Sequence, residues 1–201
     1  MAKTFKAEQR ENQIKWRKTN IPTPEWGLHN GVKYEHLIPK SIWTNALWKG
    51  IEEDLIEYLG KEDVKHHTST HNLLSSWVVC ANLYFPIRGN ASLKSLMVDF
   101  LKHKVSDNIK EITDVELEFA FPDYDDLHPS KLLGEKDGNR GSGQTSPDVA
   151  FRVKTEDGEG IVLTECKYVE RSFYPCSALT TEDSVKRKKN PNPDKLSLIH
   201  I

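Results

Sequence analysis

Apolar residues recur at helical intervals through the first half of the chain. This spacing predicts four helices, a short surface helix over residues 6–19 and longer helices over 41–59, 71–85 and 92–104. Ser41 is expected to cap the second helix and Gly60 to end it. The third segment is apolar nearly all round, which indicates a buried helix. Pro86 is expected to end it, because proline lacks the backbone N–H that a helix needs.

In the second half of the chain, apolar and polar residues alternate, which is typical of strands. Four alternating apolar residues mark one strand: Val115, Leu117, Phe119 and Phe121. Residues 147–153 and 161–169 form two β-branched runs joined by an Asp/Gly turn at 157–160, so they predict a β-hairpin. Helices followed by three strands predict an α+β or mixed α/β domain.

The chain has 201 residues, enough for one domain with a buried core and too few for two of ordinary size. We expect an N-terminal extension over residues 1–40 that packs on the core, a core domain over 41–180, and a basic, disordered tail over 181–201. Residues 196–201 read like the translation of a sequencing adapter. We therefore expect the natural chain to continue beyond about Lys195, and at least one core element to be missing.

Hydrophobic residues make up 37% of the chain and charged residues 29%, which fits a soluble globular protein. No apolar run is long enough to span a bilayer, and the start lacks the apolar stretch of a secretion signal. Cys80, Cys166 and Cys176 have neither a pairing nor a zinc-like spacing, so we expect free thiols in a reducing cytoplasm. The net charge of −2 neither favours nor excludes a nucleic-acid partner.

Three charged residues of the predicted hairpin form a candidate catalytic cluster. Glu165 and Lys167 are two residues apart, so their side chains leave the same face of one strand, and Asp148 begins the neighbouring strand. Two nearby carboxylates repel each other and suit a hard divalent cation such as Mg²⁺, or Mn²⁺ in its place. The backbone carbonyl of Cys166 is a further candidate ligand. Lys167 would orient the attacking water or neutralise charge on a phosphate.

Ordinary structural roles account for the same three residues. In that interpretation Asp148 caps a turn, and Glu165 and Lys167 form a charge pair at a sheet edge. An Asp followed at a distance by Glu-x-Lys is a loose pattern, and chance matches are common in charged proteins. The strand–turn–strand context favours the chemical interpretation, because it brings the three side chains to adjacent strands.

Residues 146–151 (Ser-Pro-Asp-Val-Ala-Phe) and 165–170 (Glu-Cys-Lys-Tyr-Val-Glu) resemble the motif of the PD-(D/E)xK nuclease superfamily, in particular its restriction-endonuclease-like branch. The approach to the motif, the residues after it, and both ends of the predicted buried helix fit the same branch. The likeness covers about residues 47–176, although only the hairpin motif is specific. It implies a central mixed sheet flanked by helices, and divalent-metal-dependent cleavage of DNA by Asp148, Glu165 and Lys167.

Members of this superfamily often add another acidic residue from an earlier element. Glu118 on the preceding strand is the first choice, with Glu116 and Glu52 as rivals. The alternative for Glu118 is a solvent-facing carboxylate without a chemical role.

Basic residues provide candidate DNA contacts. Arg152 stands on the same face of its strand as Asp148, and Lys186 and Arg187 belong to the basic run near the end of the chain. Such residues contribute salt-dependent, sequence-independent affinity for phosphates. A solvated tail is the alternative role of the basic run.

We therefore expect a cytoplasmic, Mg²⁺-dependent endonuclease that acts on DNA and contacts no membrane. Restriction enzymes often act as dimers, so the resemblance leaves a homodimer open. A catalytically inactive nucleic-acid-binding module on the same fold is the main alternative, although it would have no chemical need for all three cluster residues. A third hypothesis is a different enzyme in which the charged pair is only structural.

Overall fold

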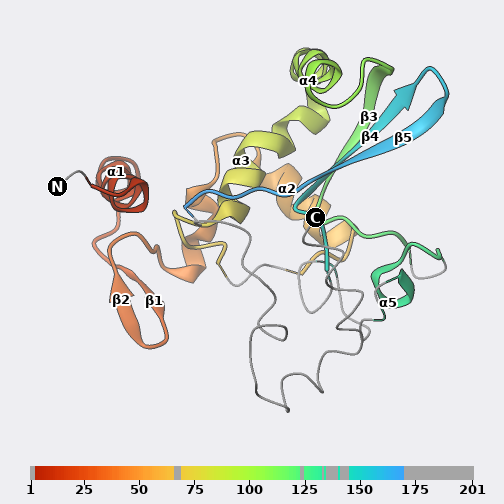
Figure 1. The fold of residues 1–201 in the computed structure, drawn as a ribbon. Helices are drawn as coiled ribbons and strands as arrows, with labels where there is room; N and C mark the ends of the chain where they lie inside the picture. The colour runs from red at the N-terminus through yellow and green to blue at the C-terminus, as the bar shows by residue number, and fades with distance from the viewer. Residues whose placement is uncertain are drawn as a thin grey trace.

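The computed structural model describes residues 3–65, 69–122, 125–132, 134, 140 and 145–169, and Figure 1 shows their arrangement. Its elements, in chain order, are α1 (Phe5–Asn20), β1 (Gly27–His29), β2 (Val32–Tyr34), the 3-10 helix η1 (Lys40–Ala46), α2 (Glu52–Lys61), α3 (Ser76–Gly89), α4 (Ala91–Lys104), β3 (Ile109–Leu117), α5 (Pro129–Leu132), β4 (Val149–Thr155) and β5 (Gly158–Thr164). The predicted tail, with Lys186, Arg187 and the adapter-like end, lies outside the described residues.

The fold is α+β, as the sequence predicts. β3, β4 and β5 form one antiparallel sheet in that order, and β1 and β2 form a separate antiparallel hairpin (Figure 1). The predicted hairpin is confirmed as β4 and β5, joined by a turn at Glu156 and Asp157. All strand pairings in the described part of the chain are antiparallel, so the parallel pair of a mixed sheet is not found there.

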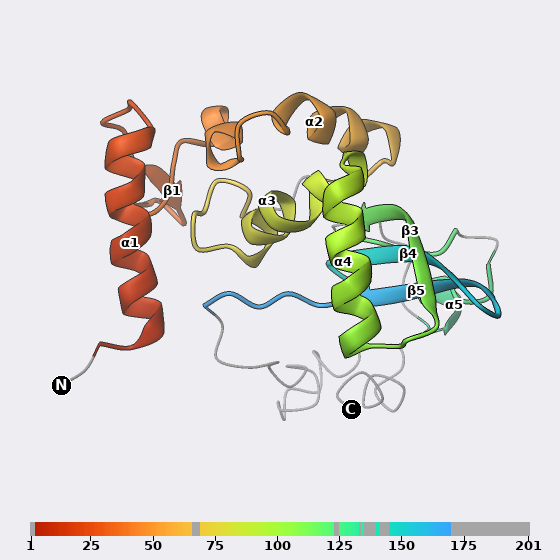
Figure 2. The ribbon, with the colours of Figure 1, turned by 90° about the horizontal axis from the view of Figure 1, so that it is seen from above.

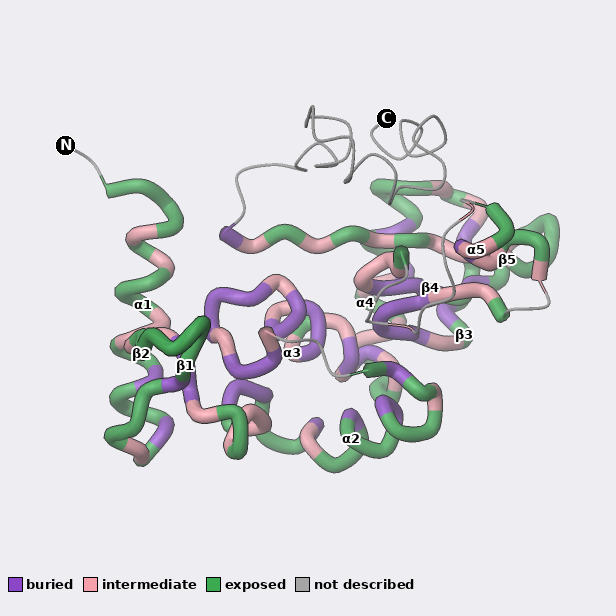
Figure 3. Tube along the Cα trace, turned by 90° about the horizontal axis from the view of Figure 1, so that it is seen from below, coloured by how far each residue is buried: buried purple, intermediate pink, exposed green. Residues whose placement is uncertain are grey.

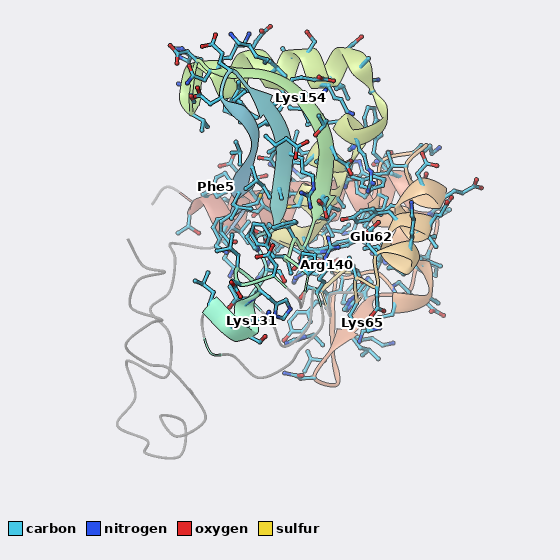
Figure 4. The ribbon with its side chains drawn as sticks, turned by 90° about the vertical axis from the view of Figure 1, so that its right-hand side faces the viewer. Phe5, Glu62, Lys65, Lys131, Arg140 and Lys154 are labelled. Carbon is cyan, nitrogen blue, oxygen red and sulfur yellow. The ribbon has the colours of Figure 1, made fainter. Side chains whose placement is uncertain are left out.

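Helices cover one face of the three-stranded sheet. α3 and α4 pack on β3, and Figure 4 shows the sheet in front of α4. The face beneath the helices is apolar, and its most buried side chains are Val115, Leu117, Val149, Phe151 and Val153. α3 is largely buried along its length (Figure 3), and its Tyr84 meets the Phe151 ring edge to face at 5.9 Å between centroids. The core therefore lies between this sheet and α3.

The predicted helix over residues 41–59 is wrong, because the structure divides it into η1 and α2. Asn82 of α3 stabilises the break. Its side-chain oxygen accepts a hydrogen bond from the Trp48 N–H at 2.5 Å, and its side-chain nitrogen donates to the last carbonyl of η1 at 2.9 Å. Ser41 consequently lies inside η1 and Gly60 inside α2, and neither residue bounds a helix.

The predicted helix over residues 71–85 is shifted along the chain, because α3 begins at Ser76 and continues through Pro86 to Gly89. The first residues of the predicted range form a turn and a β-bridge to the N-terminal region. Proline removes one backbone hydrogen bond from a helix. The last turn of α3 is nevertheless stabilised by the burial of Ile87 and by an ion pair between Arg88 and Asp114 at 3.1 Å.

Two further helices and one strand lie close to their predicted positions. α1 and α4 confirm the helices expected over residues 6–19 and 92–104. The strand expected around Val115 is confirmed as β3, but β3 ends at Leu117 and does not reach Phe121. None of the helices in the described ranges is long and apolar enough to cross a membrane.

The N-terminal helix lies at the far end of the molecule from the sheet (Figure 2). After β5 the chain leaves the sheet in an extended form and runs toward α1 (Figure 2). There the Tyr168 ring meets that of Phe5 edge to face, with 6.3 Å between centroids. The segment that carries the predicted catalytic motif is thus fixed at one end by the sheet and at the other by α1.

Candidate active site

The three strands of the sheet bring three carboxylates to one edge. Val149, the first residue of β4, lies in register between the last residues of β3 and β5. One step beyond it stand Glu118, Asp148 and Glu165, which we call the carboxylate row. The pairing extends into the row, because the Glu118 N–H donates to the Asp148 carbonyl at 3.0 Å. Residues opposite each other on adjacent strands are close neighbours, so strand register places the three acids together.

Asp148 is held by the backbone of the segment that follows β5. Its Oδ2 accepts a hydrogen bond of 2.7 Å from the Cys166 N–H. β5 ends at Thr164, so Glu165 and Lys167 lie just beyond the strand rather than in it. The hydrogen bond therefore fixes the start of this segment against the Asp148 carboxylate, and its donor residue lies between Glu165 and Lys167 in the chain.

Glu165 and Lys167 form an ion pair with each other. Their side chains are 40% and 33% exposed, so water reaches both. An ion pair this accessible is weak in water, and a competing charge can separate it at little cost. The arrangement keeps an ammonium group beside the carboxylate row.

Glu118 is buried at only 8% exposure, so its interpretation as a solvent-facing carboxylate is wrong. Its φ of 48° ends the alternation of β3 at this residue. Burial is the main cause that raises its pKa from 4.5 to about 7, and the negative charges of Asp148 and Glu165 raise it further. Arg140 opposes this rise. No group among the described residues donates a hydrogen bond to the Glu118 carboxylate. No such bond therefore offsets the free-energy cost of burying its negative charge.

Glu116 and Glu52, the other two candidates for the additional acid, bind groups outside the carboxylate row. Glu116 accepts a hydrogen bond of 2.6 Å from Arg152 and pairs with Arg140 at 3.4 Å. Glu52 accepts a hydrogen bond of 2.7 Å from the Gly50 N–H at the start of α2. Arg152, a predicted phosphate contact, is itself engaged by this ion pair. Glu118 is thus the acid from an earlier element that the structure places beside Asp148.

Arg140 is a residue of the site that the sequence analysis missed. Its guanidinium donates to the carbonyls of Leu117 (3.0 Å) and Glu118 (2.9 Å) and to the Tyr58 hydroxyl (3.1 Å). It also pairs at 3.4 Å with Glu62, the residue that follows α2, beside which it lies in Figure 4. Arg140 therefore ties α2 to the end of β3. A single arginine in a Gly-rich polar stretch gives no sequence signal for such partners.

Two free thiols meet where the segment that carries Lys167 packs on α3. Cys80 of α3 is buried, and its thiol forms a hydrogen bond with that of Cys166. This contact and burial both raise the pKa of Cys80. The expectation of free thiols is confirmed for these two residues, and Cys176 lies outside the described ones. The thiol contact packs the segment after β5 onto α3.

The donor set suits a hard cation. The carboxylates of Asp148, Glu165 and Glu118 and the Cys166 carbonyl offer the oxygen ligands that Mg²⁺ prefers. Within residues 3–169, as far as they are described, no three His, Cys, Asp or Glu side chains already converge on a metal-sized position. The buried Glu118 is the observation that favours a cation, because a positive charge would offset its repulsion by the other two acids. The residues therefore fit a divalent cation by charge and ligand type.

Comparison with known proteins identifies a family. The family model REase-ARP, described as Restriction Endonuclease associating with ARP, matches residues 7–195. The match spans the carboxylate row, Lys167 and α1. No curated protein and no solved structure shows significant similarity to the chain.

Proposed function

Because the chain belongs to the REase-ARP family of restriction-endonuclease relatives, we propose that it hydrolyses DNA phosphodiester bonds with a divalent cation. The observation that carries the proposal is the register of the sheet, which aligns Glu118, Asp148 and Glu165 in one row with Lys167 beside it. Paired acids can hold the cation of metal-assisted phosphodiester hydrolysis, and a neighbouring lysine can offset the charge that develops on the phosphate. We assign this site to the PD-(D/E)xK type on the same grounds.

In this proposal each residue has a distinct role. Asp148 and Glu165 hold Mg²⁺ or Mn²⁺, with the Cys166 carbonyl as a further ligand and Glu118 as the third acid. When bound there, the cation would lower the pKa of a water and polarise a phosphoryl oxygen. Lys167 exchanges its pairing with Glu165 for the attacking water or the phosphate, where its positive charge offsets the developing negative charge. The attacking water gives up a proton to solvent as its oxygen bonds to phosphorus, the bond to the leaving sugar oxygen breaks, and that oxygen takes up a proton from solvent.

Nicking of supercoiled plasmid tests the proposal. The purified protein is compared with Asp148→Asn and Lys167→Ala variants in Mg²⁺ and in EDTA. Lys104→Ala serves as the matched control for Lys167→Ala, because Lys104 is an exposed lysine at the end of α4. Circular dichroism establishes equal folding of all four proteins.

We expect nicking by the wild type and the control in Mg²⁺ only. Both site variants should lose about a hundredfold or more in rate, as expected when a preorganised charge in the site is removed. Equal nicking by all four proteins would show that the activity comes from elsewhere and would contradict the proposed site.

A DNA-binding role without cleavage is the second candidate function. One observation favours it: in the part of the chain that the structure describes, no three His, Cys, Asp or Glu side chains converge on a metal-sized position. In this role the carboxylate row would have no catalytic duty. Folded wild-type protein that binds DNA but does not nick it in either Mg²⁺ or Mn²⁺ would favour this candidate.

A further inference from the structure

A polar pocket lies at the N-terminal end of the molecule, apart from the carboxylate row. It is lined by residues of α1, of the β1–β2 hairpin beside it (Figure 1), of the start of η1 and of the segment 69–72, and its volume is about 560 Å³. This is within the roughly 300–1,000 Å³ of ordinary ligand sites. The side chains that give the pocket its chemistry are Arg10, His29, Tyr34, His36 and Lys40.

The cations of the pocket are not neutralised by acids. Neither Arg10 nor Lys40 has an ion-pair partner within the described ranges, and no Asp or Glu among those residues lines the pocket. Glu35, the acid next to the hairpin, pairs instead with Lys18 at 3.1 Å. Two positive charges on a concave polar surface without compensating acids concentrate anions there.

His36 reports the positive field of this pocket. Its pKa is lowered from 6.5 to about 4, first by burial and then by the charges of Arg10 and Lys6. The imidazole is therefore neutral at physiological pH, and its ring packs against that of Tyr34 with 5.5 Å between centroids. A neutral imidazole N–H and a phenol O–H are both hydrogen-bond donors for a phosphate oxygen. The pocket thus combines two positively charged side chains, Arg10 and Lys40, with two neutral hydrogen-bond donors, His36 and Tyr34.

Helix α1 joins this pocket to the candidate active site. Gln13 donates a hydrogen bond of 3.1 Å to the Tyr168 hydroxyl, which in turn donates to Gln9 at 3.1 Å. Tyr168 directly follows Lys167, and Arg10 directly follows Gln9. Helix α1 therefore contacts both the segment that carries Lys167, through Tyr168, and the pocket, through Arg10.

We infer that the pocket of Arg10, Lys40, His36 and Tyr34 binds a phosphate group, and that this phosphate belongs to a DNA strand that also passes the carboxylate row. The choice of DNA rests on the proposed function. The charge and donors of the pocket require only a phosphate, which inorganic phosphate or a free nucleotide would also supply.

DNA binding in EDTA tests this inference without any cleavage. The full chain is titrated onto a short fluorescent duplex at several salt concentrations, and separately with inorganic phosphate by calorimetry. The test protein carries Arg10→Gln and Lys40→Gln together. The matched control carries Lys102→Gln and Lys104→Gln, which remove the same charge from exposed positions of α4, across α3 from α1 (Figure 2).

We expect the pocket variant to bind the duplex about tenfold more weakly, with a salt dependence reduced by about two phosphate contacts. The control should stay within about twofold of the wild type. Loss of phosphate binding with unchanged duplex affinity would support the pocket as a phosphate site but identify a free phosphate compound as its ligand. Unchanged binding of both ligands in the pocket variant, or no binding of either by the wild type, would overturn the inference.

The nicking assay separates this inference from the proposed function. Protein that binds DNA through the pocket but never nicks would refute cleavage and leave the phosphate site standing. Protein that nicks through Asp148, with a duplex affinity indifferent to Arg10 and Lys40, would refute only the pocket.

Discussion

The buried carboxylate of Glu118 gives a direct test of the electrostatics of the carboxylate row. Replacing Glu118 with glutamine keeps the size of the side chain and removes its negative charge. The charge is costly in the metal-free protein, because the group is buried beside Asp148 and Glu165. We therefore expect Glu118→Gln to stabilise the metal-free protein at alkaline pH.

The magnitude follows from the pKa. A rise from 4.5 to about 7 on folding corresponds to about 3 kcal/mol, at about 1.4 kcal/mol for each pKa unit. The folded protein holds this proton more tightly than the unfolded chain does. The stabilisation is therefore complete below pH 4.5 and is lost as the pH rises through about 7. The unfolding free energy of the wild type should fall by up to about 3 kcal/mol over this range because Glu118 ionises. The glutamine variant has no such group, so its unfolding free energy should not fall for this reason.

Urea unfolding in EDTA from about pH 5 to about pH 8 measures the effect. The wild type and the variant should have similar unfolding free energies at about pH 5, and the variant should be more stable by about 2–3 kcal/mol at about pH 8. Glu111→Gln is the matched control, because Glu111 is an exposed acid on the same strand that pairs with Lys154 at 2.9 Å. Adding Mg²⁺ at the alkaline end should stabilise the wild type more than the variant.

If the unfolding free energies of the wild type and Glu118→Gln change with pH in parallel, this reasoning is refuted. Parallel profiles would show that the pKa of Glu118 is the same in the folded protein as in the unfolded chain. An equal shift in Glu111→Gln would trace the effect to net charge rather than to burial. The reasoning is supported only if the difference in unfolding free energy between variant and wild type grows with rising pH for Glu118→Gln and not for Glu111→Gln.

Three further substitutions test other contacts. Arg140→Met should lower the unfolding free energy by about 3 kcal/mol, because it removes the donor of the Glu118 carbonyl and a positive charge beside the buried acids Glu116 and Glu118; a loss under about 1 kcal/mol in urea would contradict this. Asn82→Leu should cost about 2 kcal/mol in the same assay, since the Trp48 N–H loses its acceptor, and unchanged stability would disprove the role of Asn82 in dividing the helix. Tyr168→Phe removes two hydrogen bonds to α1 and should speed amide exchange in that helix by roughly tenfold, whereas unaltered exchange would show that α1 is held by other contacts.

The sequence predicts those parts of the fold that depend on neighbouring residues. The β4–β5 hairpin follows from alternating apolar residues around a short Asp/Gly turn, and its register brings Asp148 level with Glu165. The apolar residues of 41–59 have helical spacing throughout, and the one local sign of the break between η1 and α2 is Gly50, whose φ is 98°. The break depends on Asn82, a residue 34 positions away from Trp48 that becomes a neighbour only after folding.

The same limit applies to the candidate site. Alternation puts Glu116 and Glu118 on one face of a strand but gives no sign that either is buried. Their burial depends on α2 and on Arg140, whose partners come from two other segments of the chain, the end of α2 and the end of β3. Charge burial of this kind is a property of tertiary packing, which local patterns do not carry.

The length of the β4–β5 turn has a consequence for how this protein tolerates insertions. The turn at Glu156 and Asp157 lies at the opposite end of the hairpin from the carboxylate row. One added residue there would slip the pairing by one position and turn every later side chain of β5 to the other face. Cys166 or Thr164 would then stand level with Asp148 in place of Glu165. A surface turn that touches no substrate is thus as intolerant of a change in length as an active-site loop.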